Sequence, residues 1–115
     1  MTFTIDTVFV WVTDLDRSVA WYREFGIEAG PRHGTWQTMT TDGTTRFGLH
    51  QGERQRDDPT AAIAFGVPDL EAEMSRLAGL GIDPVDSEVT DTGAARFITY
   101  RDPDGNEVQL LERRT

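Results

Sequence analysis

The feature that most constrains the fold is an internal repeat with a spacing of 55 residues. The motif Val-x-Asp-Leu at residues 12–15 recurs at residues 67–70, and Gly26-Ile27-Glu28 recurs as Gly81-Ile82-Asp83. In each copy a strand pattern ends at the valine, the aspartate can cap a helix, and the glycine can end that helix. Two separate landmarks at one spacing are hard to obtain by chance, so we expect two copies of one supersecondary unit.

Each copy predicts a strand, a helix and three further strands. In the first copy the strand lies within 4–15, the helix spans 17–26 behind a cap at Asp14 or Asp16, and strands follow near 27–32, 35–41 and 44–50. Asp42-Gly43 is a hairpin signal between the last two strands. In the second copy the strand is 61–67, the helix 69–81, and the later strands lie near 83–89, at 95–101 and after the Pro103-Asp104-Gly105 turn.

These elements predict an α+β fold with two tandem βαβββ modules. Module one covers about 3–52, a polar linker about 51–60, and module two about 60–113, within a single domain of 1–115. We expect the modules to form a curved mixed sheet around a concave cavity. Open sheets with apolar faces also favour a homodimer.

Composition narrows the classes of function. The chain has 115 residues, no cysteine, and a formal net charge of −9. The lack of cysteine excludes disulfides, thiolate catalysis and Cys-based zinc sites. The charge argues against nucleic-acid binding and is compatible either with solubility alone or with attraction of a cationic ligand. The absence of a signal-peptide pattern and of a run of about 20 apolar residues predicts a cytoplasmic protein without membrane contact.

Two stretches carry a resemblance to a known family. VTDLDRSVAWYREFGIE (12–28) and YRDPDGNEVQLLE (100–112) are similar to the first strand-end with its helix and to the closing turn with its strand in the vicinal oxygen chelate superfamily. That superfamily includes glyoxalase I, extradiol dioxygenases, fosfomycin-resistance enzymes and bleomycin-resistance proteins. The resemblance implies the two-module fold and a pairing of chains around the cavity, but the fold hosts enzymes and binding proteins alike.

The resemblance also implies where a divalent metal would bind. Enzymes of the superfamily use His, Glu or Gln at four strand positions, which fall here on Thr7, Gly48, Ala62 and Gln109. Ala and Gly have no side-chain donor, and Thr and Gln are neutral and weak ligands. His33 falls in a predicted turn, and His50 would still leave the site one ligand short. We therefore expect no metal and no other cofactor.

Strand alternation assigns the residues that face the cavity. On the first strand Thr7, Phe9 and Trp11 share one face, while the alternating valines pack under the helix. The predicted ligand-binding residues are Thr7, Phe9, Trp11, Trp36, Thr38, Arg46, Gly48, His50, Ala62, Ala64, Glu107, Gln109 and Leu111. Trp21 lies on the predicted helix, where its spacing from Phe25 indicates packing. Two interpretations stay open for Phe9 and Trp11: they stack on a ligand, or they fill the concavity or a dimer contact. His50 is either a polar wall residue or a direct ligand contact.

Three functions are compatible with these features. The first is a binding protein that sequesters an aromatic or cationic small molecule, such as an antibiotic, without turnover. The second is an enzyme, either a metal-dependent lyase or dioxygenase or a metal-free isomerase, with Glu107 as candidate base. The third is a domain that binds a protein segment, which no residue pattern specifically favours. The first hypothesis accounts for the aromatic residues and the missing metal ligands together.

Overall fold

The computed structural model describes residues 6–41, 43–52 and 62–114. The chain divides into two units, Met1–Asp57 (unit 1) and Asp58–Thr115 (unit 2). Unit 1 contains β1 (Thr7–Val12), α1 (Leu15–Phe25), β2 (Glu28–His33), β3 (Trp36–Thr40) and β4 (Arg46–Gln51). Unit 2 contains β5 (Ala62–Gly66), α2 (Leu70–Gly79), β6 (Thr90–Asp91), β7 (Ala95–Arg101) and β8 (Glu107–Arg113).

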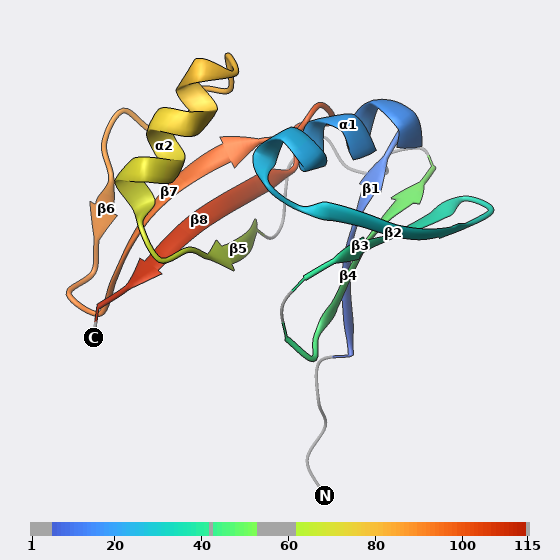
Figure 1. Cartoon of the computed structure of the whole chain (residues 1–115), viewed down its shortest axis with the longest axis horizontal. Coiled ribbons are helices and arrows are strands. Elements are labelled where there is room, and N and C mark those ends of the chain that lie inside the picture. The colour runs from blue at the N-terminus through green and yellow to red at the C-terminus, as the bar shows by residue number, and fades with distance from the viewer. Residues whose placement is uncertain (1–5, 42, 53–61, 115) are drawn as a thin grey trace, which may run out of the picture. The chain divides into compact units, whose positions relative to one another are not determined.

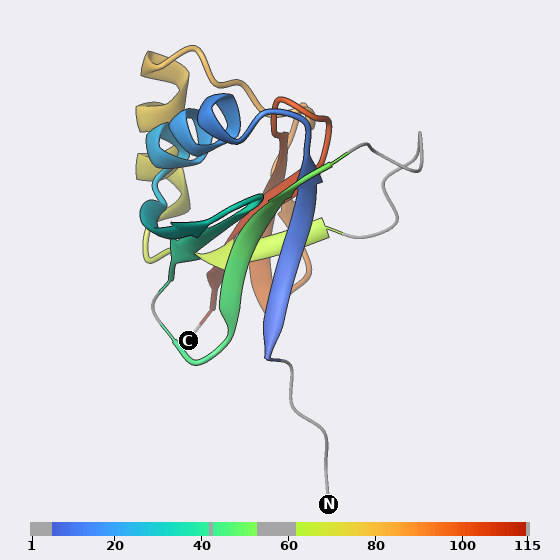
Figure 2. The ribbon, with the colours of Figure 1, turned by 90° about the vertical axis from the view of Figure 1, so that its right-hand side faces the viewer.

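The two units share one topology, which confirms the predicted βαβββ repeat. The strand order is β1-β4-β3-β2 in unit 1 and β5-β8-β7-β6 in unit 2. In each unit the first strand runs parallel to the last, and the other pairs are antiparallel. In Figures 1 and 2, α1 lies on one side of the unit 1 sheet, where it meets β2 and β4. In unit 2, α2 lies along β8.

The helix ends repeat as the sequence predicts. Asp14 and Asp69 are the N-caps, and each carboxylate accepts a hydrogen bond from the backbone N–H three residues later. After each helix a glycine takes a positive φ, 131° at Gly26 and 78° at Gly81. The next residue, Ile27 or Ile82, then donates its N–H to a carbonyl five residues earlier at 2.9 Å. The 55-residue repeat therefore corresponds to two helices followed by the same positive-φ glycine and the same isoleucine hydrogen bond, although α2 ends two residues before Gly81.

A side chain of the last strand reinforces the start of the helix in both units. The Leu15 N–H donates to Oε1 of Gln51 at 3.1 Å, and the Leu70 N–H donates to Oε1 of Glu112 at 2.9 Å. These N–H groups belong to the first turn, where no intrahelical partner exists. An amide serves in one unit and a carboxylate in the other, so acceptance of this bond does not require a charge.

Each unit buries its own apolar residues between the helix and one sheet face. Tyr22 and Phe25 of α1 and Phe47 of β4 are buried in unit 1, and the rings of Tyr22 and Phe47 meet at 5.6 Å. In unit 2, Leu70 and Leu77 of α2 are fully buried, as are the sheet residues Tyr100 and Val108. Burial raises the pKa of the Tyr100 phenol. Trp21 stacks on Phe25 with centroids 4.9 Å apart, in line with its expected packing role.

The predicted strand near 83–89 is wrong. The third element of unit 2 is only the two-residue β6, which pairs with β7. The preceding segment runs beside β7 through two isolated hydrogen bonds, from Val85 N–H to the Thr99 carbonyl at 2.9 Å and from Thr99 N–H to Oδ2 of Asp86 at 3.0 Å. The Asp86 side chain takes the place of a backbone acceptor, and Pro84 has no N–H to donate, so no regular ladder forms.

Other differences are small. The strands predicted near 27–32, 35–41 and 44–50 are β2, β3 and β4 with shifted ends, and the predicted linker begins after β4 ends at Gln51. The rest of that linker, 53–60, lies outside the described residues. His33 is not in a turn but is the last residue of β2, because the turn to β3 is made by Gly34, with φ 60°, and Thr35. In β5, Ile63 and Phe65 are half-buried rather than fully in the core.

The turn before β8 is organised by one buried carboxylate. Asp102 is 5% exposed and accepts hydrogen bonds from the Asp104 N–H at 3.0 Å, the Asn106 N–H at 2.8 Å and the Asn106 side-chain amide at 2.9 Å. Gly105 provides the positive φ of 82° that closes the turn. The turn thus fixes where β8 begins, and with it the alternation that places Glu107, Gln109 and Leu111 on one face.

Candidate ligand-binding surfaces

The predicted site residues of unit 1 lie together on one face of its sheet. The register pairs Thr7 with Arg46 and Phe9 with Gly48, and Thr38 is the partner of Gly48 on the other side. One row further, His50 lies between Trp11 and Trp36. Residues paired across neighbouring strands project from the same face, so these eight positions form one continuous surface.

Four rings on this face contact one another and are called here the aromatic surface: Phe9, Trp11, Trp36 and His50. Trp11 stacks on His50 with centroids 4.4 Å apart and an interplanar angle of 20°. Phe9 meets the other three rings edge-to-face at 5.5 to 5.9 Å. Phe9 is nevertheless 42% exposed and Trp11 39% exposed. The rings are therefore held in place by each other while much of their area remains open.

Gly48 supplies the space for one of these rings. A Cβ at position 48 would lie 2.1 Å from Cζ2 of Trp36, because the indole lies directly over the glycine. The Trp36 Nε1–H donates to Oγ1 of Thr38 at 3.0 Å, which fixes the ring in that place. Gly48 is one of the predicted ligand-binding residues, and a glycine leaves the space above it free for another group. In unit 1 that room is filled by Trp36, and the ligand-accessible area is the outer surface of the rings.

His33 extends the row of paired residues formed by Trp11, His50 and Trp36, although it is not among the predicted ligand-binding residues. It pairs with Trp36 in the β2–β3 ladder, so both histidines of the chain flank that tryptophan. His33 is exposed. The signal that could have revealed it is the short Gly34-Thr35 turn, which fixes the register of β2 against β3.

The predicted site residues of unit 2 occupy one face of the other sheet. Ala62 pairs with Glu107, Ala64 with Gln109, and Gly66 with Leu111. The Gln109 amide donates to Oγ1 of its cross-strand neighbour Thr99 at 3.2 Å, and Glu107 lies 3.9 Å from the Arg101 guanidinium. Glu107 and Gln109, two of the predicted ligand-binding residues, therefore already interact with side chains of β7.

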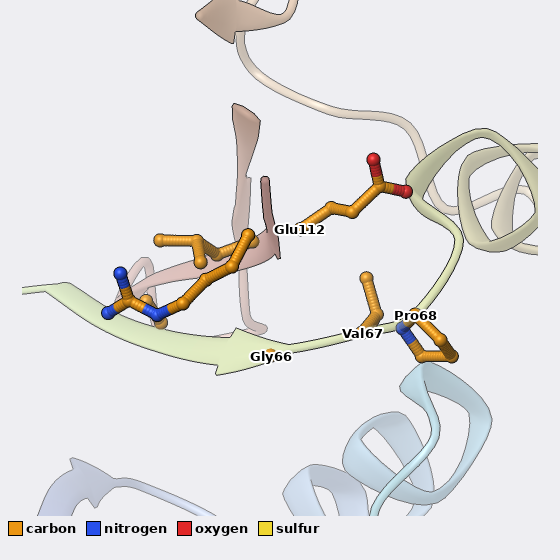
Figure 3. A pocket seen from close by; sticks show the side chains of 7 residues that line it. Gly66, Val67, Pro68 and Glu112 are labelled. Carbon is orange, nitrogen blue, oxygen red and sulfur yellow. The ribbon is translucent and has the colours of Figure 1, made fainter. Parts of the chain in front are cut away.

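A pocket of about 570 Å³ opens at the end of this face where β5 and β8 finish. It is lined by Ala64, residues 66–68 and residues 111–113. Most of these side chains are small or apolar, and Leu111 is half-buried. Figure 3 shows Glu112 extending toward the start of α2, where it accepts the Leu70 N–H.

The four positions at which the resemblance implies metal ligands do not fit a metal. Position 48 is a glycine covered by an indole, position 62 is an alanine, and the Gln109 amide is bonded to Thr99. No imidazole or carboxylate stands at any of the four to balance a dication.

Among the described residues, the carboxylates of Asp69, Glu71 and Glu112 come within 4.8 Å of one another at the start of α2. Arg96 already pairs with two of them: it donates hydrogen bonds to both Glu71 oxygens and lies 3.6 Å from Glu112. The hydrogen bond from Arg96 holds the pKa of the Glu71 carboxyl below its usual range. This cluster is accounted for as a link between α2 and the sheet.

No helix in the described part of the chain combines the length and apolar character needed to cross a bilayer.

Several solved structures are similar to this chain. A virulence protein from Salmonella typhimurium is 25% identical, with a TM-score of 0.78 over 99% of both chains. A glyoxalase/bleomycin resistance protein from Catenulispora acidiphila is 26% identical, with a TM-score of 0.74 over 96% of this chain and 100% of that one. Oxidase ChaP-H2 is 21% identical, with a TM-score of 0.77 over 99% of this chain and 96% of that one, which shows the fold alone.

The search of curated proteins finds no match. The family model described as the Glyoxalase/Bleomycin resistance protein/Dioxygenase superfamily matches residues 4–110. This match spans both repeats, both helix caps and the Asp102 turn, and it confirms the resemblance carried by the two motifs. The chain belongs to the glyoxalase/bleomycin resistance protein/dioxygenase superfamily.

Proposed function

We propose that this protein is a small-molecule binding protein whose aromatic surface on unit 1 holds a planar aromatic ligand. The observation that carries the proposal is the open but mutually fixed arrangement of Phe9, Trp11, Trp36 and His50. Rings that stay exposed normally lose side-chain entropy when a ligand orders them. Here ring-to-ring contacts already restrict them, so less of that cost remains to be met on binding.

The chemistry of the surface favours a flat ligand. Offset-stacked and edge-to-face ring pairs contribute about 0.5–1.5 kcal/mol each beyond area burial. Phe9 and Trp11 are the two most exposed aromatic side chains among the described large hydrophobic residues. A planar molecule that covers both would bury apolar area and gain ring contacts at once. The formal net charge of −9 further favours a ligand that carries a positive charge.

Capture without turnover is the mode of action that we propose. The superfamily's metal positions offer no suitable ligand set, and Glu107, the candidate base of the enzymatic alternative, lies 3.9 Å from Arg101. The finer parts of the proposal are that the captured molecule is an antibiotic, that capture confers resistance in the cytoplasm, and that the protein works as a homodimer. Sedimentation equilibrium tests the last part: a mass of twice 12.9 kDa supports it, and a mass of 12.9 kDa at all concentrations contradicts it.

Tryptophan fluorescence tests the proposal directly. All three tryptophans lie in unit 1, two of them on the aromatic surface and Trp21 in α1. A Trp21→Phe background therefore leaves emission only from the proposed site. Titration of this variant with bleomycin, mitomycin C and a planar anthraquinone should give saturable quenching with at least one of them. The absorption spectrum of the probe, followed for hours, should not show conversion to a product.

Two variants locate the binding. In Trp11→Ala, measured by calorimetry, the dissociation constant should rise at least tenfold, which is the effect of about 1.4 kcal/mol. Trp21→Phe should bind as the unaltered protein does, since its ring stacks on Phe25 within α1. If no planar probe quenches saturably, or if Trp11→Ala binds unchanged, the proposed site is wrong. Catalytic conversion of the probe would refute capture without turnover while leaving the site intact.

A further inference from the structure

Unit 2 has a pocket lined by one acidic and one basic residue that differ in their partners. The pocket of about 570 Å³ at the ends of β5 and β8 lies within the range of about 300–1,000 Å³ that is usual for small-molecule sites. Five of its seven lining residues carry no charge and form an apolar floor, namely Ala64, residues 66–68 and Leu111. Two charged residues of β8, Glu112 and Arg113, complete the lining. The two charges are not equivalent, because only one of them is committed to the fold.

Glu112 is committed to structure. Its Oε1 accepts the Leu70 N–H at 2.9 Å, and its Oε2 lies 3.6 Å from Arg96. Figure 3 shows the carboxylate at the α2 end of the pocket, beyond Val67 and Pro68. A ligand cation that took this carboxylate would have to displace both partners, so Glu112 is not a ready contact.

Arg113 differs from the other arginines of its unit. Within the described residues 62–114 there are five arginines, and four of them have a carboxylate within 4.0 Å: Arg76, Arg96, Arg101 and Arg114. Arg113 has no such partner among the described residues, although the chain carries twenty acidic side chains against eleven basic ones. Among the arginines of residues 62–114, Arg113 is therefore the one without a carboxylate within 4.0 Å, and it lines the pocket.

We propose that this pocket binds a small amphipathic carboxylate, with the acid on Arg113 and the apolar chain over Ala64, Gly66 and Leu111. A guanidinium pairs with a carboxylate through two parallel hydrogen bonds, which makes a carboxylate the matching anion. The apolar floor is needed as well, because the net charge of −9 repels anions at long range. A bare inorganic anion buries no apolar surface and should therefore bind more weakly than an amphipathic carboxylate. This proposal uses residues of unit 2 alone and does not depend on the proposed function.

Titration of ¹⁵N-labelled protein with octanoate tests the proposal. The amide signals of Gly66, Leu111 and Arg113 should shift saturably. Octanol tests the need for charge and inorganic phosphate tests the need for the chain, and both should bind at least tenfold more weakly. Binding of octanol as tightly as octanoate, or equal binding of phosphate, would contradict the proposal. So would saturable shifts confined to other residues.

Matched variants assign the role of Arg113. Arg113→Gln should weaken octanoate binding at least tenfold, whereas Arg114→Gln should not, because Arg114 is paired with Asp91 outside the pocket. Arg113→Lys should restore part of the affinity, and unchanged dispersion of the ¹H–¹⁵N spectrum confirms folding. Equal affinities of the two glutamine variants would overturn the assignment. The readout is independent of tryptophan fluorescence, since every tryptophan lies in unit 1, so failure here is distinguishable from failure of the aromatic surface.

Discussion

Replacing Gly48 by alanine tests whether the aromatic surface is a packed structure or a loose set of rings. The added Cβ would lie 2.1 Å from Cζ2, 2.4 Å from Cη2 and 2.8 Å from Cε2 of Trp36. Carbon atoms pack at about 3.5–4.0 Å, so the indole must move by more than 1 Å. That movement breaks the Nε1–H bond to Thr38 and disturbs the edge-to-face contact with Phe9 at 5.8 Å.

The change in the free energy of unfolding is the balance of two destabilising contributions and one stabilising contribution. Overpacking costs about 1–3 kcal/mol, and loss of the hydrogen bond adds about 0.5–1.5 kcal/mol. Replacing a glycine within a strand by alanine recovers about 0.5–1 kcal/mol of backbone entropy. Gly48→Ala should therefore lower the free energy of unfolding by about 0.5–4 kcal/mol. Urea unfolding followed by tryptophan emission measures this for unit 1, which contains all three tryptophans.

Gly66→Ala is the matched control. Gly66 also lies in a strand, but the nearest atom to an added Cβ is the Leu111 carbonyl oxygen at 4.0 Å. Only the entropy term applies there, so far-UV circular dichroism should show equal or slightly greater stability, by up to about 1 kcal/mol. If Gly48→Ala is as stable as Gly66→Ala, then Trp36 is not fixed over Gly48 and the preformed surface is refuted.

Three further predictions concern the framework. Asp102→Ala should lower thermal stability by the equivalent of about 2–3 kcal/mol, because three hydrogen-bond donors of the turn lose a buried carboxylate. A loss below about 0.5 kcal/mol, the usual effect of a surface substitution, would contradict this. Glu112→Gln should keep the cap on the Leu70 N–H, whereas Glu112→Ala should cost about 1 kcal/mol in urea unfolding; equal losses would refute the cap. Because Arg96 lowers the Glu71 pKa, this carboxylate stabilises the fold at pH values above its ordinary pKa, and the contribution is lost as the pH falls through the pKa of the folded state. NMR titration should therefore show a higher Glu71 pKa in Arg96→Gln than in the unaltered protein. An unchanged Glu71 pKa would exclude the pair.

The repeat made most of the fold predictable. Helix caps, helix-ending glycines and strand alternation are local signals, and Asp14, Asp69, Gly26 and Gly81 occupy the places that the spacing implies. The segment 83–89 was not predictable in this way, because a side chain and an isolated backbone bond replace the ladder there. A side chain that substitutes for a backbone acceptor produces no periodic pattern of apolar and polar residues in the sequence.

The sequence allowed us to predict which residues share one face of the unit 1 sheet, but not how their side chains pack. Alternation placed Phe9, Trp11 and Trp36 on one face, since that depends only on strand direction and register. It could not show that the Trp36 ring covers Gly48, because that depends on a rotamer. His33 was missed because its place in the row follows from the end of β2, and strand ends are the least certain part of a pattern-based assignment.

Intermolecular nuclear Overhauser effects test directly whether the aromatic surface of unit 1 binds the ligand. Of bleomycin, mitomycin C and the anthraquinone, the probe that quenches tryptophan emission most strongly should be used. We expect cross-peaks from its ring protons to the ring protons of Phe9 and Trp11, which have the largest exposed fractions of the Phe, Tyr and Trp side chains described. The probe should also be recovered chemically unchanged. Cross-peaks only to residues outside the aromatic surface, with none to Phe9 or Trp11, would contradict the claim that this face of unit 1 is the ligand-binding site.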